Sequence, residues 1–133
     1  MRLNRCLALA AFVGILASSY PTSSVRAQQQ AQQKGPVFFV VELNVKEREE
    51  FDRDYASQAG ALVTQHGGTF LVGGEKVQPV EGTPPEGVVI IVRFDSMDQA
   101  RSFLDSPEYK KIVPVRQKTA DTRSYLVQGA AAQ

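Results

Sequence analysis

The sequence contains one cysteine, one histidine and no tryptophan. A single cysteine cannot form an intramolecular disulfide, so packing must stabilise the fold. A single histidine cannot supply a multi-histidine metal site, and no Gly-x-Ser-x-Gly motif marks a serine hydrolase. The Gly73-Gly74 pair lacks the spacing of a phosphate-binding loop. These absences argue against metal, serine hydrolase and nucleotide chemistry, and we expect neither a cofactor nor a metal ion.

The chain also lacks an excess of charge of one sign. Its 15 basic and 14 acidic residues give a formal net charge of +1. No basic stripe is interleaved with aromatic residues, so nothing in the sequence would attract a phosphate backbone. We therefore expect no nucleic-acid partner.

Long hydrophobic runs are missing as well. The apolar run at residues 7–17 falls short of the ~20 residues that a membrane-spanning helix needs. Two arginines, Arg2 and Arg5, precede this run, and residues 25–27 fit the small-x-small pattern of an export cleavage site. Residues 1–27 are therefore predicted to be a signal peptide, with an N-terminal membrane anchor as the alternative.

Cleavage after Ala27 would define the exported protein. It would remove the only cysteine and leave a periplasmic or secreted chain without a stable membrane anchor. Residues 28–35 are rich in glutamine and lack large apolar side chains, so we predict a disordered spacer there. The folded domain is expected at residues 36–130.

Four segments of this domain have the composition or the alternation of β-strands. Along the first, Phe39 and Val41 point one way while Val40 and Glu42 point the other. The four predicted strands are residues 37–45, 69–72, 88–94 and 122–128. Gly73 is expected to end the second, and residues 77–80 are predicted to add an irregular edge segment because a proline there cannot donate to a ladder.

Helices are predicted between these strands. Residues 47–66 carry apolar side chains at helical spacing, and Gly67 follows where a left-handed C-cap is favoured. A capping box that begins at Ser96 predicts a second helix. Ser106 is predicted to cap again, and Pro114 to kink or split the helix that follows.

The order strand, helix, strand, strand, helix, strand predicts an α+β fold. With right-handed crossovers it gives a ferredoxin-like βαββαβ sandwich, in which a four-stranded antiparallel sheet carries its helices on one face. The other face is apolar too, because residues such as Phe38, Val40, Val89 and Ile91 point away from the helices in the predicted register. An exposed apolar sheet face marks an interface, so we expect an isologous homodimer.

Several segments together resemble a known family. The combined pattern resembles the domain of unknown function 1330 family of the dimeric alpha-beta barrel superfamily. The segments that carry the resemblance are FFVVEL at 38–43, HGGTFL at 66–71, VEG at 80–82, VII at 89–91, SPEY at 106–109 and LVQG at 126–129. The resemblance implies a small dimer whose two sheets form a barrel around a central cavity. It implies no established reaction, since the superfamily includes monooxygenases, isomerases, haem enzymes and non-catalytic stress proteins.

Polar residues near the strand ends are the candidate site. Glu42 alternates with apolar residues, so its pKa could be raised for proton transfer, although a structural ion pair is the alternative. The fourth strand begins where the first ends, which places Arg123 beside Glu42 and makes Arg116 a second candidate partner. We predict that Glu42, Arg116 and Arg123, with Tyr109, bind a small carboxylate or phenolate.

The single histidine is the other catalytic candidate. His66 is predicted to end the first helix near Arg93 and Asp95 and to bond a free carbonyl group. Catalysis or haem ligation by His66 is the alternative. Tyr55 and Tyr109 are expected to pack in the core with satisfied hydroxyl groups.

Two functions are compatible with these residues. One is an exported, uncharacterised dimer that binds a small apolar or aromatic acid in its cavity. The other is a cofactor-independent enzyme of the monooxygenase or isomerase type that acts on a small aromatic substrate. An open pocket with converging polar groups would favour catalysis, and a closed, filled barrel would favour binding or a structural role.

Overall fold

The computed structural model describes residues 35–131. The predicted signal peptide and all of the predicted spacer except Gly35 lie outside the described residues and stay predictions. None of the helices that are described combines the length and the apolar character needed to cross a membrane.

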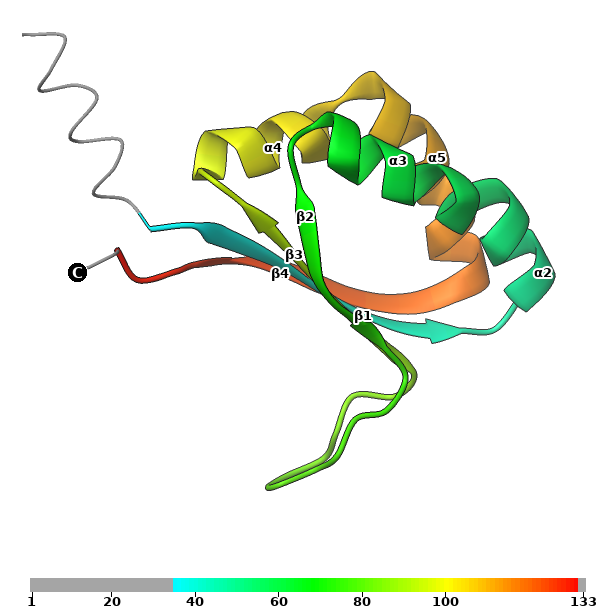
Figure 1. Ribbon diagram of the computed structural model, residues 1–133. Coiled ribbons are helices and arrows are strands. Elements are labelled where there is room, and N and C mark those ends of the chain that lie inside the picture. Colours follow the sequence, from blue (N-terminus) through cyan, green and yellow to red (C-terminus); the bar gives the residue numbers. More distant parts are fainter. Residues whose placement is uncertain (1–34, 132–133) are drawn as a thin grey trace, which may run out of the picture.

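Four strands form one antiparallel sheet with the strand order β2-β3-β1-β4. Their bounds are β1 Val37–Val45, β2 Thr69–Gly74, β3 Val88–Phe94 and β4 Ala120–Gln128. The helices cover one face of this sheet (Figure 1). The sheet order, the antiparallel pairing and the one-sided helical layer confirm the predicted ferredoxin-like α+β fold.

The second strand and the segment after it differ from the prediction. β2 does not end at Gly73, because Gly73 and Gly74 pair with β3 through their backbones, which needs no side chain. Residues 77–80 form no strand. They belong to a loop at residues 75–87, here called the arm, in which Pro79 removes a backbone donor and Val80 is 98% exposed. The arm extends from the sheet on the side opposite the helices (Figure 1).

The first helical segment, residues 48–65, has three parts. It begins as α2 Arg48–Phe51, passes through the π-helical turn η1 Asp52–Ala56 and continues as α3 Ser57–Gln65. Gly67 follows with a φ of 76°, the left-handed conformation expected of it. The prediction of one regular helix missed the π-helical turn.

The other two helices, α4 Met97–Asp105 and α5 Pro107–Thr119, begin at the predicted caps. Ser96 Oγ accepts a hydrogen bond from the Gln99 amide at 3.1 Å, and Ser106 Oγ accepts one from the Tyr109 amide at 3.3 Å. Pro114 lies inside α5 and does not split it. A proline removes only one hydrogen bond of the helix, and α5 is held on both sides of it by the buried residues Ile112 and Arg116.

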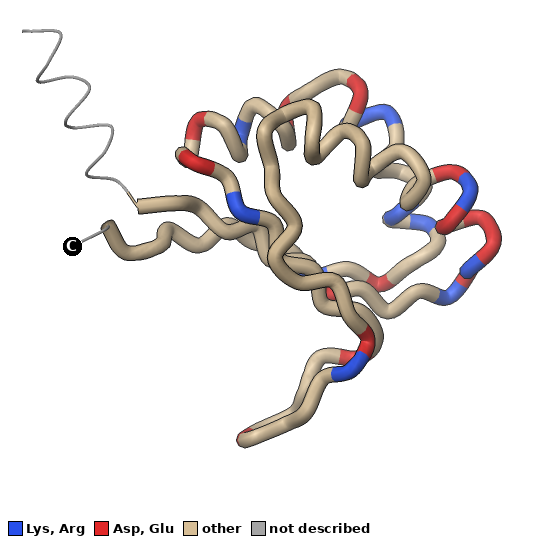
Figure 2. Tube along the Cα trace, in the orientation of Figure 1, with Lys and Arg blue, Asp and Glu red and all other residues tan. Residues whose placement is uncertain are grey.

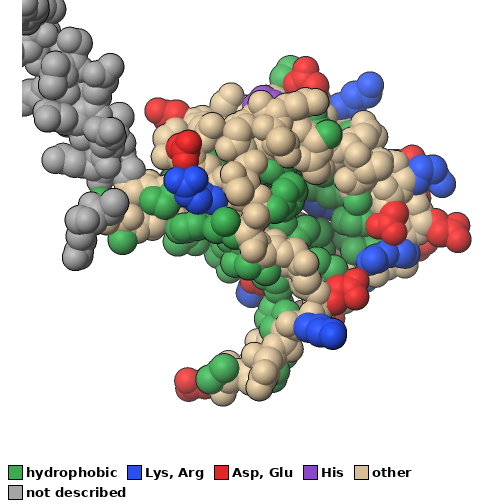
Figure 3. Space-filling model, viewed as in Figure 1, with side chains coloured by type: hydrophobic (Ala, Val, Ile, Leu, Met, Phe, Trp, Pro, Cys, Tyr) green, Lys and Arg blue, Asp and Glu red, His purple; other side chains and the backbone are tan. Residues whose placement is uncertain are grey.

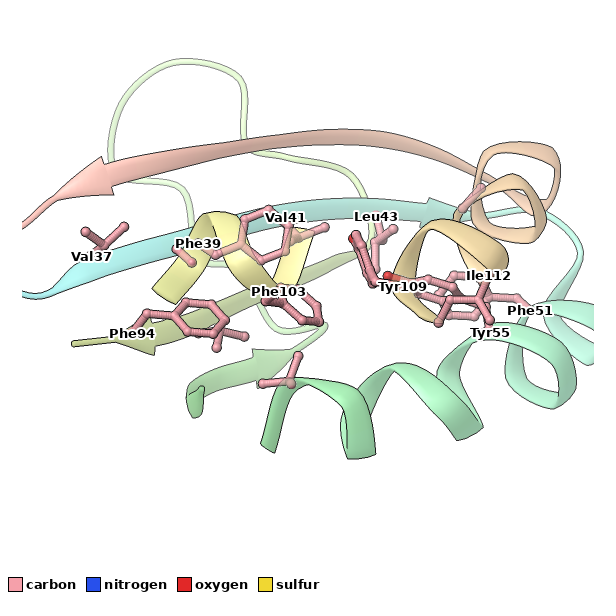
Figure 4. Packing of buried hydrophobic residues seen from close by; sticks show 14 residues of the cluster. Val37, Phe39, Val41, Leu43, Phe51, Tyr55, Phe94, Phe103, Tyr109 and Ile112 are labelled. Carbon is pink, nitrogen blue, oxygen red and sulfur yellow. The ribbon is translucent and has the colours of Figure 1, made fainter. Parts of the chain in front are cut away.

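The core lies between the sheet and the helical layer, where aromatic side chains from both layers meet (Figure 4). Phe103 of α4 stacks on Phe94 of β3, with ring centroids 5.6 Å apart, and packs against Tyr109 of α5 at 4.4 Å. The charged residues lie mainly along the helices and the arm, and few lie on the strands (Figure 2).

The sheet face away from the helices, here called the open face, is also apolar. A β-bulge in β2 shifts the register between Phe70 and Val72. Consequently Leu71 and Val72 both reach the open face. The residues that surround a shallow hollow there are Phe38, Val40, Leu71, Val72, Ile91 and Val127.

Candidate ligand cavity

A cavity of about 180 Å³ lies between the sheet and the helical layer. Strands β1, β2 and β3 supply residues on the sheet side, and the first helical segment, α4 and α5 supply residues on the helical side. The residues that line it are Phe39, Val41, Leu43, Phe51, Tyr55, Ala56, Ala59, Gly60, Val63, Phe70, Ile90, Val92, Phe103 and Tyr109. Hydrophobic side chains surround a hollow at this place on the molecular surface (Figure 3).

Small residues on the first helical segment leave the space for this cavity. Ala56, Ala59 and Gly60 line the cavity, and larger side chains at these positions would reduce its volume. A Cβ atom placed on Gly60 would meet nothing within 4 Å. Small residues on this helical segment therefore contribute to the space of the cavity.

Two tyrosines and one arginine form the polar end of the cavity region. Arg116 Nη1 donates hydrogen bonds to the hydroxyl of Tyr109 at 2.5 Å and to that of Tyr55 at 3.4 Å. The guanidinium carbon also lies 5.6 Å from the Tyr55 ring centroid and 5.8 Å from that of Tyr109. Tyr109 and Arg116 are seven residues apart on α5, which places them on the same face two turns apart.

Arg116 is buried and has no carboxylate partner among residues 35–131. Its relative exposure is 8%, and its Nε atom has no hydrogen-bond partner in the described chain. A buried charge is costly unless an opposite charge or hydrogen bonds compensate it. The two tyrosine hydroxyls compensate it only in part, so this end of the cavity is suited to an anion.

The protonation states here follow from burial. Burial raises the pKa of Tyr109 above its ordinary value, and Tyr55 adds to this, while Arg116 lowers the pKa of Tyr109 by less. Burial works to lower the pKa of Arg116, but the hydroxyls of Tyr55 and Tyr109 outweigh it and raise that pKa. The site therefore holds a neutral Tyr109 beside a charged Arg116 at neutral pH.

The π-helical turn brings Tyr55 to this site. Phe51, Tyr55, Ala59 and Val63 all line the cavity at a spacing of four residues. In a regular α-helix of 3.6 residues per turn, that spacing drifts around the axis by about 40° per step. The wider π-helical turn reduces this drift and keeps the four residues on one face. Such turns are frequent at functional sites.

An open groove of about 650 Å³ adjoins the cavity. It shares the lining residues Leu43, Phe51 and Ile90 with the cavity, so the two are neighbours. Arg48 on its rim pairs with Asp52 at 3.0 Å and with Glu75 at 3.5 Å. The groove lies between α2 and the end of β2, next to the cavity.

Glu42 lies on the open face, away from this cavity. Its carboxylate accepts hydrogen bonds from Arg123 at 2.7 and 3.0 Å and from the Tyr125 hydroxyl at 3.3 Å. The predicted pairing with Arg123 is confirmed, but Arg116 belongs to a different cluster. The sheet separates the two, because Glu42 points to the open face and Arg116 lies on a helix over the covered face. A role of Glu42 or Arg123 in ligand binding or proton transfer stays a prediction.

His66 follows α3 as its C-cap, as predicted. Its ring packs against Phe103, with centroids 5.8 Å apart, and the described chain shows no hydrogen bond from the ring. The expected bond to a free carbonyl is therefore not formed, because the ring turns toward the aromatic core. Arg93 and Asp95 pair with each other at 2.9 Å. Within residues 35–131 no three acidic, histidine or cysteine side chains are grouped to hold a metal, and a catalytic role of His66 stays a prediction.

The sequence argument did not identify Tyr55 as part of a site. Its hydroxyl was expected to be satisfied in the core, and Arg116 does bond it. The available signal was the four-residue spacing from Phe51 to Val63, which fits a helix with a widened turn better than a regular one.

The fold and the cavity define a small ferredoxin-like α+β domain. The chain belongs to the family described as domain of unknown function (DUF1330), which matches residues 36–130. No curated protein matches the chain.

Solved structures with the same fold share little sequence with this chain. A protein of unknown function from Rhodopseudomonas palustris is 20% identical, with a TM-score of 0.61, and the match covers 85% of this chain and 97% of that one. SnoaB, a cofactor-independent oxygenase from Streptomyces nogalater, is 18% identical, with a TM-score of 0.53 and coverage of 74% and 96%. A hypothetical protein from Arabidopsis thaliana is 15% identical, with a TM-score of 0.55 and coverage of 76% and 94%. At these identities the likeness concerns the fold alone.

Proposed function

We propose that this protein binds a small apolar or aromatic molecule with one acidic oxygen in the cavity between its sheet and its helices. The observation that carries the proposal is Arg116, a buried cation without a carboxylate partner among residues 35–131, which lies behind two residues of an otherwise apolar cavity. An anionic ligand would compensate this charge, and its apolar part would replace water in the cavity.

The size of the cavity limits the ligand. An apolar protein cavity of ~150 Å³ accepts benzene, and the cavity here measures about 180 Å³. One aromatic ring with a small substituent therefore fits. A longer substituent would have to extend into the adjoining groove.

Catalysis is the second candidate. Tyrosine hydroxyls beside an apolar cavity could position a small aromatic substrate for a cofactor-independent monooxygenase or isomerase reaction. The fold shared with the oxygenase SnoaB is compatible with this candidate. Binding precedes either function, so the binding site is tested first.

The test is calorimetric titration with benzoate and 4-hydroxybenzoate. Replacing Arg116 with methionine should weaken binding at least tenfold, a change of ~1.4 kcal/mol or more, because it removes the buried charge that would compensate the anionic ligand. Arg101→Met, at an exposed arginine of α4, is the matched control and should bind as the wild type does.

A second variant tests the cavity without touching the arginine. Gly60→Leu should fill the cavity and abolish binding, while Gly60→Ala should leave binding largely intact, since the space around Gly60 is open. Both substitutions favour the helix over glycine by up to ~1 kcal/mol, so the fold should persist. Wild-type affinity in both Arg116→Met and Gly60→Leu would reject the proposed site.

We also propose that two copies associate through their open faces. A contiguous apolar surface of this kind is rare on a monomer. Its polar residues at one end are already paired, since Glu42 bonds Arg123 and Tyr125. The arm extends on the same side and would flank a second copy (Figure 1). A two-fold dimer would cover the apolar side chains, and each copy would keep its own ligand cavity on the opposite face.

A further inference from the structure

Only two of the side chains that line the cavity carry polar atoms, and both are tyrosines. Tyr55 and Tyr109 stand among aliphatic and phenylalanine side chains. Arg116 does not line the cavity and lies behind the tyrosines, to which it donates hydrogen bonds. The two tyrosine rings turn toward the interior between helices and sheet (Figure 4). A ligand in this cavity would therefore meet phenol hydroxyls backed by a cation.

The hydrogen-bond directions leave a donor for the ligand. A guanidinium group has no acceptor, so both tyrosine oxygens accept from Arg116 and their protons point elsewhere. No acceptor for these protons is bonded within residues 35–131. If one of the two tyrosine hydroxyls donates to the other, the proton of the accepting hydroxyl still remains available to a ligand. A hydroxyl that already accepts from a cation is also a stronger donor, because hydrogen bonds in a chain polarise one another.

The charge of the site favours one state of the ligand. With Arg116 charged and Tyr109 neutral, a neutral ligand leaves a positive charge that the tyrosines compensate only in part. An oxyanion cancels it. Burial raises the pKa of the bound ligand. A fixed cation one hydroxyl away and an oriented hydroxyl donor lower it, and both act strongly where the dielectric constant is low.

We propose that the cavity binds a phenol or an enol as its conjugate base, with the single oxyanion accepting hydrogen bonds from Tyr55 and Tyr109 and with Arg116 as the counter-charge behind them. This inference rests on the proposed function, because it requires that a ligand occupies the cavity. Carboxylic acids are already ionised at neutral pH. The arrangement therefore changes the protonation state mainly of weaker oxygen acids such as phenols and enols.

The experiment uses 4-nitrophenol, whose neutral and ionised forms absorb at different wavelengths. Its nitro group can extend toward the groove. The pKa of the bound molecule is measured by spectrophotometric titration in the presence of excess protein and compared with that of the free molecule. We expect the bound pKa to be lower by about one unit or more, and nitrobenzene, which lacks the hydroxyl, to bind at least tenfold more weakly.

The variant Tyr55→Phe/Tyr109→Phe keeps both rings and Arg116 but removes both hydroxyl donors. It should lose most of the shift in ligand pKa. If the double variant does not fold, Tyr55→Phe alone is the test. It removes the more distant hydroxyl, at 3.4 Å from Arg116, and should reduce the shift in ligand pKa. Arg101→Met serves as the control with an unchanged shift.

The outcomes separate the two proposals. Binding of 4-nitrophenol with an unchanged or raised pKa would overturn the oxyanion site and leave the proposed binding function intact. A lowered pKa that persists in both tyrosine variants would also overturn it. If neither 4-nitrophenol nor benzoate binds, the proposed function fails, and the oxyanion site fails with it.

Discussion

Two arginines of this chain have opposite environments. The side chain of Arg123 is 72% exposed and pairs with Glu42 on the open face. Arg116 is buried, and within the described chain its guanidinium donates hydrogen bonds only to tyrosine hydroxyls and lies near the same two tyrosine rings. An exposed ion pair contributes ~0–1 kcal/mol to stability, whereas a buried unpaired cation is costly and marks a site. The same residue type thus forms a structural ion pair in one place and carries the proposed ligand site in the other.

The pair on the open face gives a prediction at the residue scale. Glu42→Gln should lower the free energy of unfolding by about 1 kcal/mol or less, because Arg123 is exposed and can be hydrated once its partner loses its charge. Ligand binding should be unchanged, since the cavity lies on the other face. Chemical denaturation and the benzoate titration measure the two quantities.

Arg123→Gln is the control for this experiment, and the two variants combined should cost little more than either alone. Loss of ligand binding at unchanged stability in Glu42→Gln would instead assign the ligand site to the open face.

At the scale of the elements, Ser106 joins two helices. It is buried, its hydroxyl donates to the Phe103 carbonyl at 2.8 Å where α4 ends, and it accepts from the Tyr109 amide at 3.3 Å where α5 begins. Tyr109 is also the residue that Arg116 bonds. The cap therefore positions the first turn of the helix that carries the site.

Ser106→Ala should lower the free energy of unfolding by about 1–2 kcal/mol, because it removes a helix cap and leaves a buried amide without its partner. Ser96→Ala is the matched comparison, since Ser96 caps α4 alone through one bond at 3.1 Å and is only half-buried. It should cost less. Urea unfolding of both variants measures the difference, and an equal or smaller loss in Ser106→Ala would show that its second bond contributes nothing.

The caps and strands could be predicted from the sequence because their causes are local. Ser96, Ser106 and Gly67 act within one turn of the backbone. The π-helical turn and the β-bulge between Phe70 and Val72 could not, because packing against other elements selects their hydrogen-bond registers. For the same reason the sequence indicated Tyr109 and Arg116 as ligand residues but grouped Arg116 with Glu42, since strand order alone does not say which face of the sheet a helical side chain occupies.

On the scale of the whole molecule, the sheet separates two surfaces for which we propose different roles. The covered face bears the core and the ligand cavity, and the open face bears apolar side chains with nothing over them in a single chain. The family resemblance implied a cavity enclosed by two sheets, whereas the cavity described above lies within one chain. Association and ligand binding are therefore expected to be separable.

Ile91→Lys tests this separation. Ile91 lies on β3, one of the two central strands, beside Phe38 and Val40 on the open face. In a two-fold dimer the substitution would bury two ammonium groups without partners, at a cost of several kcal/mol. Light scattering at micromolar concentration should then report a monomer in place of the wild-type dimer.

Gln117→Lys, at an exposed position of α5, adds the same charge on the helical side and should leave the dimer intact. The monomeric variant should still bind benzoate, because its cavity is built from one chain. A wild-type protein that is already monomeric would reject the open-face dimer, and a monomeric variant that no longer binds benzoate would show that the second copy completes the site.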